Sequence, residues 1–327
     1  MKKILLIISF LLITSFYLFA LFDDYEPSVR ARSMAGAYTA TSDSYDGIFY
    51  NPAGISLAGN QYGGAYTKLY GNSFTALTTV GGTIKTKIGS VALGFQDMSV
   101  EYQDINLMGE RTFSIGHSVC LTKDVNSEVY FGWAGNIYNL SFDEMGNQNS
   151  FGVNAGIIAI LHSRTRLGFN VTNINKPKIG SENEHQLPQR LAAGISYVPY
   201  QGVTTAFDIK KDWHGDTEYR AGIEVEVHPM LLLRTGVRNN PASYSFGFGI
   251  KPYKGFELDY AMSTHSVLNP THHIGVKLFW CISQIVIIKL YNSEMTFKLQ
   301  WIMISYWFLF QKLGMKVLIW NNKTQSD

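Results

Sequence analysis

Three groups of polar side chains have the residue types needed for metal binding or acid–base chemistry. The groups are Glu182, Glu184 and His185; Asp212, Trp213, His214 and Asp216; and the adjacent pair His272 and His273. Adjacent strand residues point to opposite faces, so the two histidines are poorly placed to share one metal ion. The other two groups lie between predicted strands, where solvated polar residues are the more common explanation. The sequence therefore predicts no catalytic residue, no metal site and no cofactor.

Three arginines, Arg220, Arg234 and Arg238, are candidates for binding a carboxylate, because a guanidinium donates two parallel hydrogen bonds. They share one alternating phase of the chain with other charged residues of both signs. Those residues are Asp208, Lys210, Glu224, Glu226, Lys251, Glu257, Asp259, His273 and Lys277. Mixed signs favour ion pairs between neighbouring strands over a pore that selects one charge. We therefore predict a ladder of ion pairs, with carboxylate binding as the alternative.

The elements that must position these residues are short β-strands. Fourteen runs of β-type residues follow one another from residue 60 to residue 280, and most have the length of about 9–11 residues that a tilted strand needs to cross a bilayer. The predicted strands are 60–69, 73–84, 88–97, 111–121, 128–138, 150–161, 164–173, 189–198, 202–210, 217–227, 230–238, 243–251, 255–263 and 271–280. An even number suits an antiparallel barrel closed by a single chain.

Apolar and polar residues alternate along these runs. Ile223 and Val225 share one phase, and Gly222 and Glu224 share the other. In a membrane barrel the apolar phase faces lipid, whereas a soluble β-sandwich has the same period with its apolar face inward. Connection lengths favour the barrel, since tight turns alternate with predicted longer loops at 98–110, 139–149 and 174–188.

Glycines gather in the polar phase, which would line the lumen. They are Gly94, Gly116, Gly132, Gly152, Gly156, Gly168, Gly194, Gly222, Gly236, Gly247, Gly249 and Gly275, whereas Gly135 lies in the other phase. A strand glycine often marks a place where other backbone approaches closely. Two explanations stay open: the glycines leave room for a segment inside the barrel, or they let the wall curve.

The N-terminus has the pattern of a secretory signal peptide. Basic residues at Lys2 and Lys3 precede an apolar run over 4–19, and Ala20 is a small residue suited to cleavage. The alternative is an uncleaved membrane anchor. Charged residues make up only 16% of the chain and the net charge is +2, so nothing favours nucleic acid as a partner. The two cysteines, Cys120 and Cys281, argue against a disulfide framework.

Between the signal peptide and the first strand, residues 21–59 are small and polar. They contain the stretch ARSMAGAY at 31–38 and FYNPAG at 49–54. These motifs resemble the N-terminal hatch of the FadL-like outer-membrane β-barrel superfamily, particularly its PorV/PorQ branch. The matching residues are Ser33, Met34, Gly36, Asn51, Pro52 and Gly54. The first motif is two residues shorter than the family's ARSMAMGGAY, so the hatch backbone is expected to differ there.

The resemblance implies an exported barrel of the bacterial outer membrane, with a hatch that plugs the lumen. It further implies passive uptake of small hydrophobic molecules. The alternative is a PorV-type component that docks exported proteins during secretion, and a barrel hydrolase is a third, unfavoured hypothesis. The expected partners are outer-membrane lipid, the barrel assembly machinery, and either hydrophobic small molecules or exported proteins.

The last predicted strand alternates and ends on an aromatic residue, as the signal for outer-membrane assembly does. Ile274, Val276, Leu278 and Trp280 form its apolar phase. Residues 281–327 lack this alternation and are rich in Ile, Lys, Asn and Trp. We interpret this tail as sequence outside the ancestral reading frame, after a frameshift or a lost stop codon. The alternative is an interfacial helix.

Overall fold

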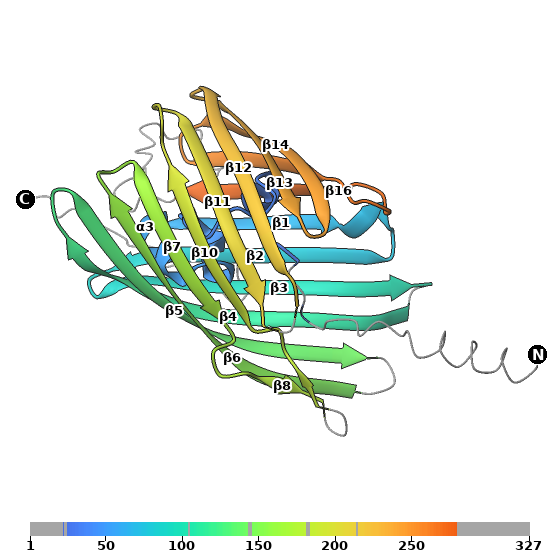
Figure 1. Ribbon diagram of the computed structural model, residues 1–327. Coiled ribbons are helices and arrows are strands. Elements are labelled where there is room, and N and C mark those ends of the chain that lie inside the picture. Colours follow the sequence, from blue (N-terminus) through green and yellow to red (C-terminus); the bar gives the residue numbers. More distant parts are fainter. Residues whose placement is uncertain are drawn as a thin grey trace, which may run out of the picture. The chain divides into compact units, whose positions relative to one another are not determined.

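In a computed structural model of the chain, fourteen antiparallel strands close into a barrel (Figure 1). The structure describes Phe22 and residues 25–103, 105–142, 146–180, 184–213 and 215–279. Each barrel strand pairs with its neighbours in the sequence, and β1 closes the barrel against β16. No helix within the described residues has the length and hydropathy needed to cross a membrane. The predicted fold class, an all-β antiparallel barrel of about fourteen strands, is confirmed.

The barrel strands correspond one for one to the predicted runs. They are β1 (Gln61–Lys68), β2 (Thr75–Thr86), β3 (Gly89–Tyr102), β4 (Ile105–Lys123), β5 (Ser127–Phe142), β6 (Gly146–Leu161), β7 (Thr165–Thr172), β10 (Arg190–Tyr197), β11 (Val203–Asp212), β12 (Thr217–His228), β13 (Leu231–Asn239), β14 (Ala242–Tyr253), β15 (Phe256–Ser263) and β16 (Thr271–Phe279). Tight connections such as 162–164 and 254–255 form one rim of the barrel, here called the turn rim. The opposite rim, which carries the connection 173–189, is called the loop rim.

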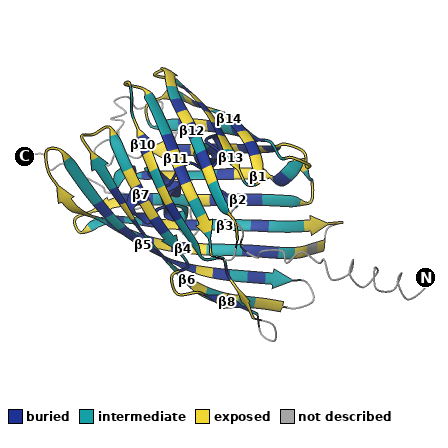
Figure 2. Cartoon of the chain, in the orientation of Figure 1, coloured by how far each residue is buried: buried dark blue, intermediate teal, exposed yellow. Residues whose placement is uncertain are grey.

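Burial alternates along the strands, with the polar phase buried and the apolar phase exposed (Figure 2). On β12, Arg220 and Glu224 are buried, whereas Tyr219 and Ile223 are 47% and 43% exposed. A sandwich would bury its apolar phase, so the structure decides in favour of a barrel. An exposed apolar surface that extends around a closed barrel is suited to lipid rather than water.

Two of the three predicted long loops are strand instead. β3 ends at Tyr102 and β4 begins at Ile105, so nearly all of 98–110 is strand, and most of 139–149 belongs to β5 and β6. Their polar sequence misled the loop prediction. The ladder continues beyond the length needed to cross a bilayer, and Met98, Glu110 and Leu140 are buried inside that extension.

The third predicted loop, at 174–188, is a true connection. It contains the two-residue strands β8 (Lys178–Ile179) and β9 (His185–Gln186), which pair with each other. Ile179 and Leu187 are buried against Phe22 and Tyr138. Ile179 and Leu187 thus anchor this connection to the interior of the barrel, whereas Lys178 and residues 184–186 are exposed.

Residues 25–59, here called the N-terminal segment, lie inside the barrel and form none of its strands (Figure 1). The segment contains α2 (Val29–Ser33), the 3-10 turns η1 (Tyr45–Phe49) and η2 (Pro52–Gly54), and α3 (Ile55–Ala58). Ser28 begins α2 by accepting a hydrogen bond from the Ala31 N–H through its hydroxyl oxygen. Asn51 begins η2 in the same way, with Pro52 at the first position.

The predicted domain boundaries in part concern residues outside the described ranges. The signal peptide at 1–20, the tail at 281–327, and Trp280 and Cys281 all lie there. Within the described residues, Ile274, Val276 and Leu278 lie on the exposed face of β16, opposite the buried Lys277. The assembly signal predicted for this strand and the origin of the tail stay predictions.

Candidate functional site

A ring of glycines on the lumen side of the wall surrounds the N-terminal segment. One glycine on each of twelve strands would place a Cβ atom against this segment: Gly63, Gly81, Gly94, Gly116, Gly132, Gly156, Gly168, Gly194, Gly222, Gly236, Gly247 and Gly275. The remaining two strands contribute Ala206 and Ala261, which pair with Gly222 and Gly247. These residues, here called the glycine ring, make room for the segment, which decides between the two explanations left open by the sequence.

The approach is closest where backbone meets backbone. A Cβ at Gly236 would lie 2.6 Å from the Met34 carbonyl oxygen and 2.7 Å from the Ala35 nitrogen. A Cβ at Gly132 would lie 2.5 Å from the Ala53 nitrogen. Such distances require backbone to move. The segment thus fills the middle of the lumen by direct contact with the wall.

The structure places the motif residues at this contact. Ser33 and Met34 pack on Gly247 and Gly222, and Pro52 packs on Gly132. The Asn51 amide donates hydrogen bonds to the carbonyl oxygens of Thr39 (2.9 Å) and Ile157 (3.2 Å), which tie it to the segment and to β6.

The conformation and the close neighbours of Gly36 and Gly54, the two glycines of the motifs, explain why glycine stands at these positions. Gly36 has a φ of +82°, which disfavours a side chain. Gly54 lies against Ser42, where a Cβ would be 2.6 Å from the hydroxyl oxygen. Gly54 therefore serves the folding of the segment itself, whereas Gly36 also leaves room for the Arg220 side chain of β12.

Buried ion pairs hold the N-terminal segment to the wall. Arg30 binds Glu224 on β12 with two hydrogen bonds of 2.8 Å, and it binds Asp43 of the segment at 2.6 Å. Asp43 in turn binds Arg166 on β7 at 2.6 Å. Two strands on different parts of the barrel are thus connected through Arg30 and Asp43.

The three arginines predicted to contact a ligand all have protein partners. Arg234 binds Glu224 at 2.6 Å, Glu257 at 3.1 Å and Asp259 at 2.5 Å, and its side chain is only 1% exposed. Arg220 and Arg238 both bind Glu26 of the segment, at 3.0 and 3.1 Å. The structure therefore has the predicted ion pairs, but several of them connect the wall to the segment as well as strand to strand. Ligand binding by these arginines stays untested.

The carboxyl groups of the segment respond to pH in opposite directions. Burial alone would raise the pKa of Asp43, but Arg30 and Arg166 hold it well below its ordinary value. Burial raises the pKa of Asp46 above its ordinary value, although Lys277 and hydrogen bonds from Ser28 and Tyr38 oppose this. Asp43 therefore stabilises the seated segment at neutral pH, whereas ionisation of Asp46 works against it.

We expect protonation of Asp43 to loosen the N-terminal segment in acid, against the opposite effect of Asp46. A lowered pKa at Asp43 contributes stability that is fully present above the ordinary carboxyl pKa of about 4 and is lost as pH falls below it. Hydrogen exchange of the Tyr38 and Thr39 amides between pH 7 and pH 3, corrected for intrinsic rates, measures this loosening. In Asp43→Asn the loosening should be present already at neutral pH and change less with acid. Equal protection of both amides in the two proteins would contradict this role of Asp43.

Two small cavities remain between the segment and the wall, toward the loop rim. They have volumes of about 70 and about 80 Å³, and both are lined by Phe49, Thr172 and Arg190. The smaller also contacts Asn170 and Asp208, and the larger contacts Tyr138 and Asn154. In each of these cavities a small molecule would meet both aromatic and polar groups.

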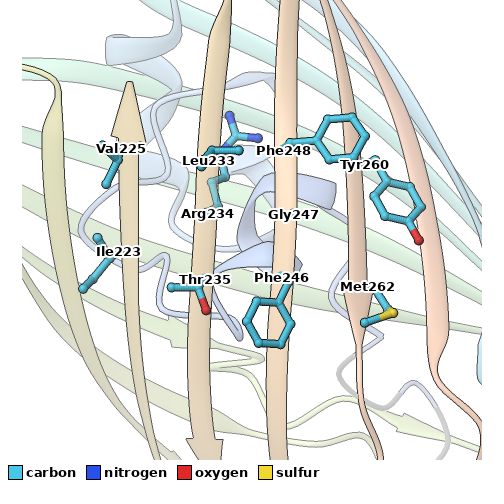
Figure 3. Close-up of a pocket in the computed structure, with 10 residues that line it drawn as sticks. All are labelled: Ile223, Val225, Leu233, Arg234, Thr235, Phe246, Gly247, Phe248, Tyr260 and Met262. Carbon is cyan, nitrogen blue, oxygen red and sulfur yellow. The ribbon is translucent and has the colours of Figure 1, made fainter. Parts of the chain in front are cut away.

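A larger hollow, of about 500 Å³, opens on the lipid-facing side of the wall (Figure 3). It lies on strands β12 to β15, and most of its lining is apolar. Its lining residues are Ile223, Val225, Leu233, Arg234, Thr235, Phe246, Gly247, Phe248, Tyr260 and Met262. All except Arg234 and Gly247 belong to the outward phase, so this groove is suited to lipid acyl chains and lies apart from the lumen site.

The polar groups considered for metal or acid–base chemistry are dispersed. Glu184 binds Lys178, Asp212 binds Arg190, and Glu182 and His214 lie outside the described residues. His272 is exposed and contacts Tyr260, whereas His273 is buried beside Thr67. No cluster of three metal-ligating side chains occurs among the described residues.

Several residues of the site escaped the sequence analysis. Gly63 and Gly81 of the glycine ring were not singled out, nor were Glu26, Arg30 and Asp43. Glycines at one position per strand carry a detectable signal, because they recur in the polar phase of almost every run. No sequence signal identifies the ion-pair partners, since Arg30 and Glu224 are 194 residues apart in the chain.

Comparison with known proteins supports the barrel fold. No family model and no curated protein matches the sequence. The structure is similar to the CymD monoaromatic hydrocarbon channel, with a TM-score of 0.56 and 14% identity over 77% of this chain and 97% of that chain. It is also similar to a TodX monoaromatic hydrocarbon channel mutant, with a TM-score of 0.52 and 11% identity over 78% and 98% of the two chains.

A Pseudomonas aeruginosa FadL homologue is a third similar structure, with a TM-score of 0.51 and 9% identity over 78% and 98% of the two chains. At these identities the similarity shows a shared barrel fold. Placement in the PorV/PorQ branch stays a prediction.

Proposed function

We propose that the protein is an outer-membrane channel for passive uptake of small hydrophobic molecules, closed at rest by its N-terminal segment. The observation that carries this proposal is the contact between the segment and the glycine ring, which fills the middle of the lumen. Three further features support it: the exposed apolar wall, the small cavities between segment and wall, and a fold similar to that of two monoaromatic hydrocarbon channels.

In this proposal a substrate enters from the loop rim and reaches the cavities above the segment. The segment must then shift locally, because its backbone or side chains are in contact with glycines on twelve of the fourteen strands. The ion pairs of Arg30 and Glu26 reform afterwards, which returns the channel to its closed state. The chain's own residues thus supply both the barrier and the restoring force, and no energy source is required.

A disulfide between segment and wall tests this proposal directly. The Cβ atoms of Val29 and of a side chain placed at Gly275 would be 3.5 Å apart, within the range of a disulfide. The variant is Val29→Cys with Gly275→Cys in a Cys120→Ser, Cys281→Ser background, expressed in cells whose toluene uptake is measured. Oxidation should reduce uptake to the level of cells without the protein, and reduction should restore it.

The single variant Val29→Cys in the same background is the matched control and should be insensitive to oxidation. Undiminished uptake by the oxidised double variant would contradict movement of the segment. Single-channel recordings that showed a wide and permanently open aqueous pore would contradict the proposal as a whole.

The outer-membrane location has its own test. A chain that ends after Trp280 should fractionate with the outer membrane and migrate faster in an unheated gel than in a heated one, because a closed barrel resists detergent. This result would also establish that residues 281–327 are dispensable for assembly. A soluble periplasmic product would contradict the location and with it the uptake function.

The resemblance in the sequence also implied docking of exported proteins during secretion. No feature of the described residues favours that role specifically. Co-purification of large exported proteins with the barrel would revive it, and the loop rim would then be the expected docking surface.

A further inference from the structure

The groove on the lipid-facing side of β12 to β15 is a single apolar hollow of about 500 Å³ (Figure 3). Thr235 lies in it between larger side chains, among them Phe246 and Phe248. Its hydroxyl donates a hydrogen bond to the Ser245 carbonyl oxygen at 3.0 Å, so it needs no partner in the groove. A chain of methylene groups therefore fits this hollow better than water or a polar ligand does.

One row of the strand ladder connects the groove with the loop rim. Met262 lines the groove, and it pairs with His272 on β16. His272 in turn pairs with Lys68 on β1, and both belong to the outward phase. Because neighbouring strands are about 4.8 Å apart, Lys68 lies about 10 Å from Met262 along this row. Lys68 is the last residue of β1, so the row reaches the loop rim there.

Lys68 and His272 provide hydrogen-bond donors at this end of the row. Both side chains are exposed. The Tyr260 hydroxyl and His272 Nδ1 are 2.7 Å apart. When the hydroxyl donates to Nδ1, the Nε2–H of the neutral ring remains as a donor. Lys68 Nζ has no hydrogen-bond or ion-pair partner among the described residues. An ammonium group and a directed N–H are thus available side by side.

The neighbouring elements supply no anion for these donors. The outward residues of β15, β16 and β1, all within the described ranges, include no carboxylate. Neither do the connections 69–74 and 264–270, where the one titratable group besides Tyr70 is His265. A lysine on the outer face of a barrel costs least near the membrane interface, which suits the place of Lys68 at the loop rim. At that level of a membrane the available anion is the phosphate of a lipid headgroup.

We propose that the groove, Lys68 and His272 form a binding site for one phosphorylated membrane lipid. An acyl chain of the lipid occupies the groove, and its phosphate contacts the Lys68 ammonium and the His272 Nε2–H. A lipid of the leaflet at the loop rim has its phosphate at the interface and its chains toward the midplane, which matches the order of these two parts. The site lies on the outside of the barrel and goes beyond the proposed uptake function.

Phosphatidylglycerol and dioleoylglycerol provide the test, because with two oleoyl chains on each they differ by the phosphate headgroup. Binding of each to the purified full-length protein in an uncharged detergent is measured by native mass spectrometry. One phosphatidylglycerol should bind at least about fivefold more tightly than dioleoylglycerol. Lys68→Gln with His272→Gln should remove this preference. Thr235→Trp, which fills the groove, should weaken the binding of both lipids.

Lys254→Gln is the matched control, since it removes the same charge from an exposed residue at the turn rim and should leave the preference unchanged. An equal loss in this control, or equal binding of the two lipids by the unaltered protein, overturns the inference. Displacement of phosphatidylglycerol by millimolar inorganic phosphate also overturns it, because the site would then bind phosphate without a lipid. Gel mobility shows whether Thr235→Trp has folded, and Thr235→Phe is the milder substitute.

Toluene uptake by cells is measured separately from lipid binding. Loss of the lipid preference with normal uptake would leave the channel function intact. Lipid binding by a protein that takes up no toluene would leave the lipid site intact.

Discussion

The double variant Gly132→Val, Gly236→Val is expected to conduct ions continuously in planar bilayers, whereas the unaltered protein stays closed. The two glycines lie on β5 and β13, and each is in contact with backbone of the N-terminal segment, at Ala53 and at Met34. A valine at either position would overlap backbone atoms of the segment, which cannot rotate away as a side chain can. The segment must therefore move from its position in the lumen. The barrel wall itself has no such conflict, because strands accept valine readily.

The control for this experiment is Gly135→Val on β5. Gly135 faces the outward phase, where the nearest atoms belong to the flexible ring of Phe151 at 3.3 Å. This variant should fold equally well and stay closed. If the double variant stays closed and keeps native gel mobility, the segment has accommodated both valines without opening a path for ions. The plug function would then be wrong. An unfolded double variant is recognised by loss of that mobility, and Gly236→Ala is the milder substitute.

Replacing Arg234 by methionine is expected to lower the free energy of unfolding by about 3–5 kcal/mol. Its guanidinium binds Glu224, Glu257 and Asp259 at once, and its side chain is 1% exposed. Methionine has a similar length but no charge, so three buried carboxylates lose a shared cation. Urea unfolding of the barrel in lipid vesicles measures the change.

Arg111→Met is the matched control. Arg111 binds a single carboxylate, Asp97, at 2.9 Å, and its side chain is 42% exposed. An ion pair of this kind contributes at most about 1 kcal/mol. If the two variants unfold at the same urea concentration, the buried network does not stabilise the barrel. Stability would then have to come from the strand ladder and from the contacts of the glycine ring.

The strand pattern was predictable because a barrel wall has a solvent on each face. Lipid outside and a polar lumen inside impose a period of two on every strand, and this period is visible in residues such as Ile223 and Glu224. The predicted loops at 98–110 and 139–149 were wrong for a related reason. The extensions of β3 to β6 contain polar runs such as 146–149, which have the composition of a loop although the strand ladder continues through them.

The glycine ring was only half predictable. Its members recur in the polar phase, but whether they serve curvature or contact depends on what lies opposite, and this needs the position of residues 25–59. The motifs around Ser33 and Asn51 indicated a hatch by resemblance. Only the structure pairs Ser33 with Gly247 and Pro52 with Gly132, because the partners are far apart in the chain.

The strand number, the residues of each strand that share a face and the mixed sign of the charges in the polar phase were predictable from the sequence, since these are local properties of alternating residues. The tertiary structure alone decided which charges meet. Arg30 finds Glu224, and Asp43 finds Arg166, only when the barrel has closed around the segment. The same closure brings Asn154 and Asn170 to the cavities beside Phe49. Contacts across a closed lumen depend on the pairing register and the curvature of all fourteen strands together. No local sequence pattern contains that information.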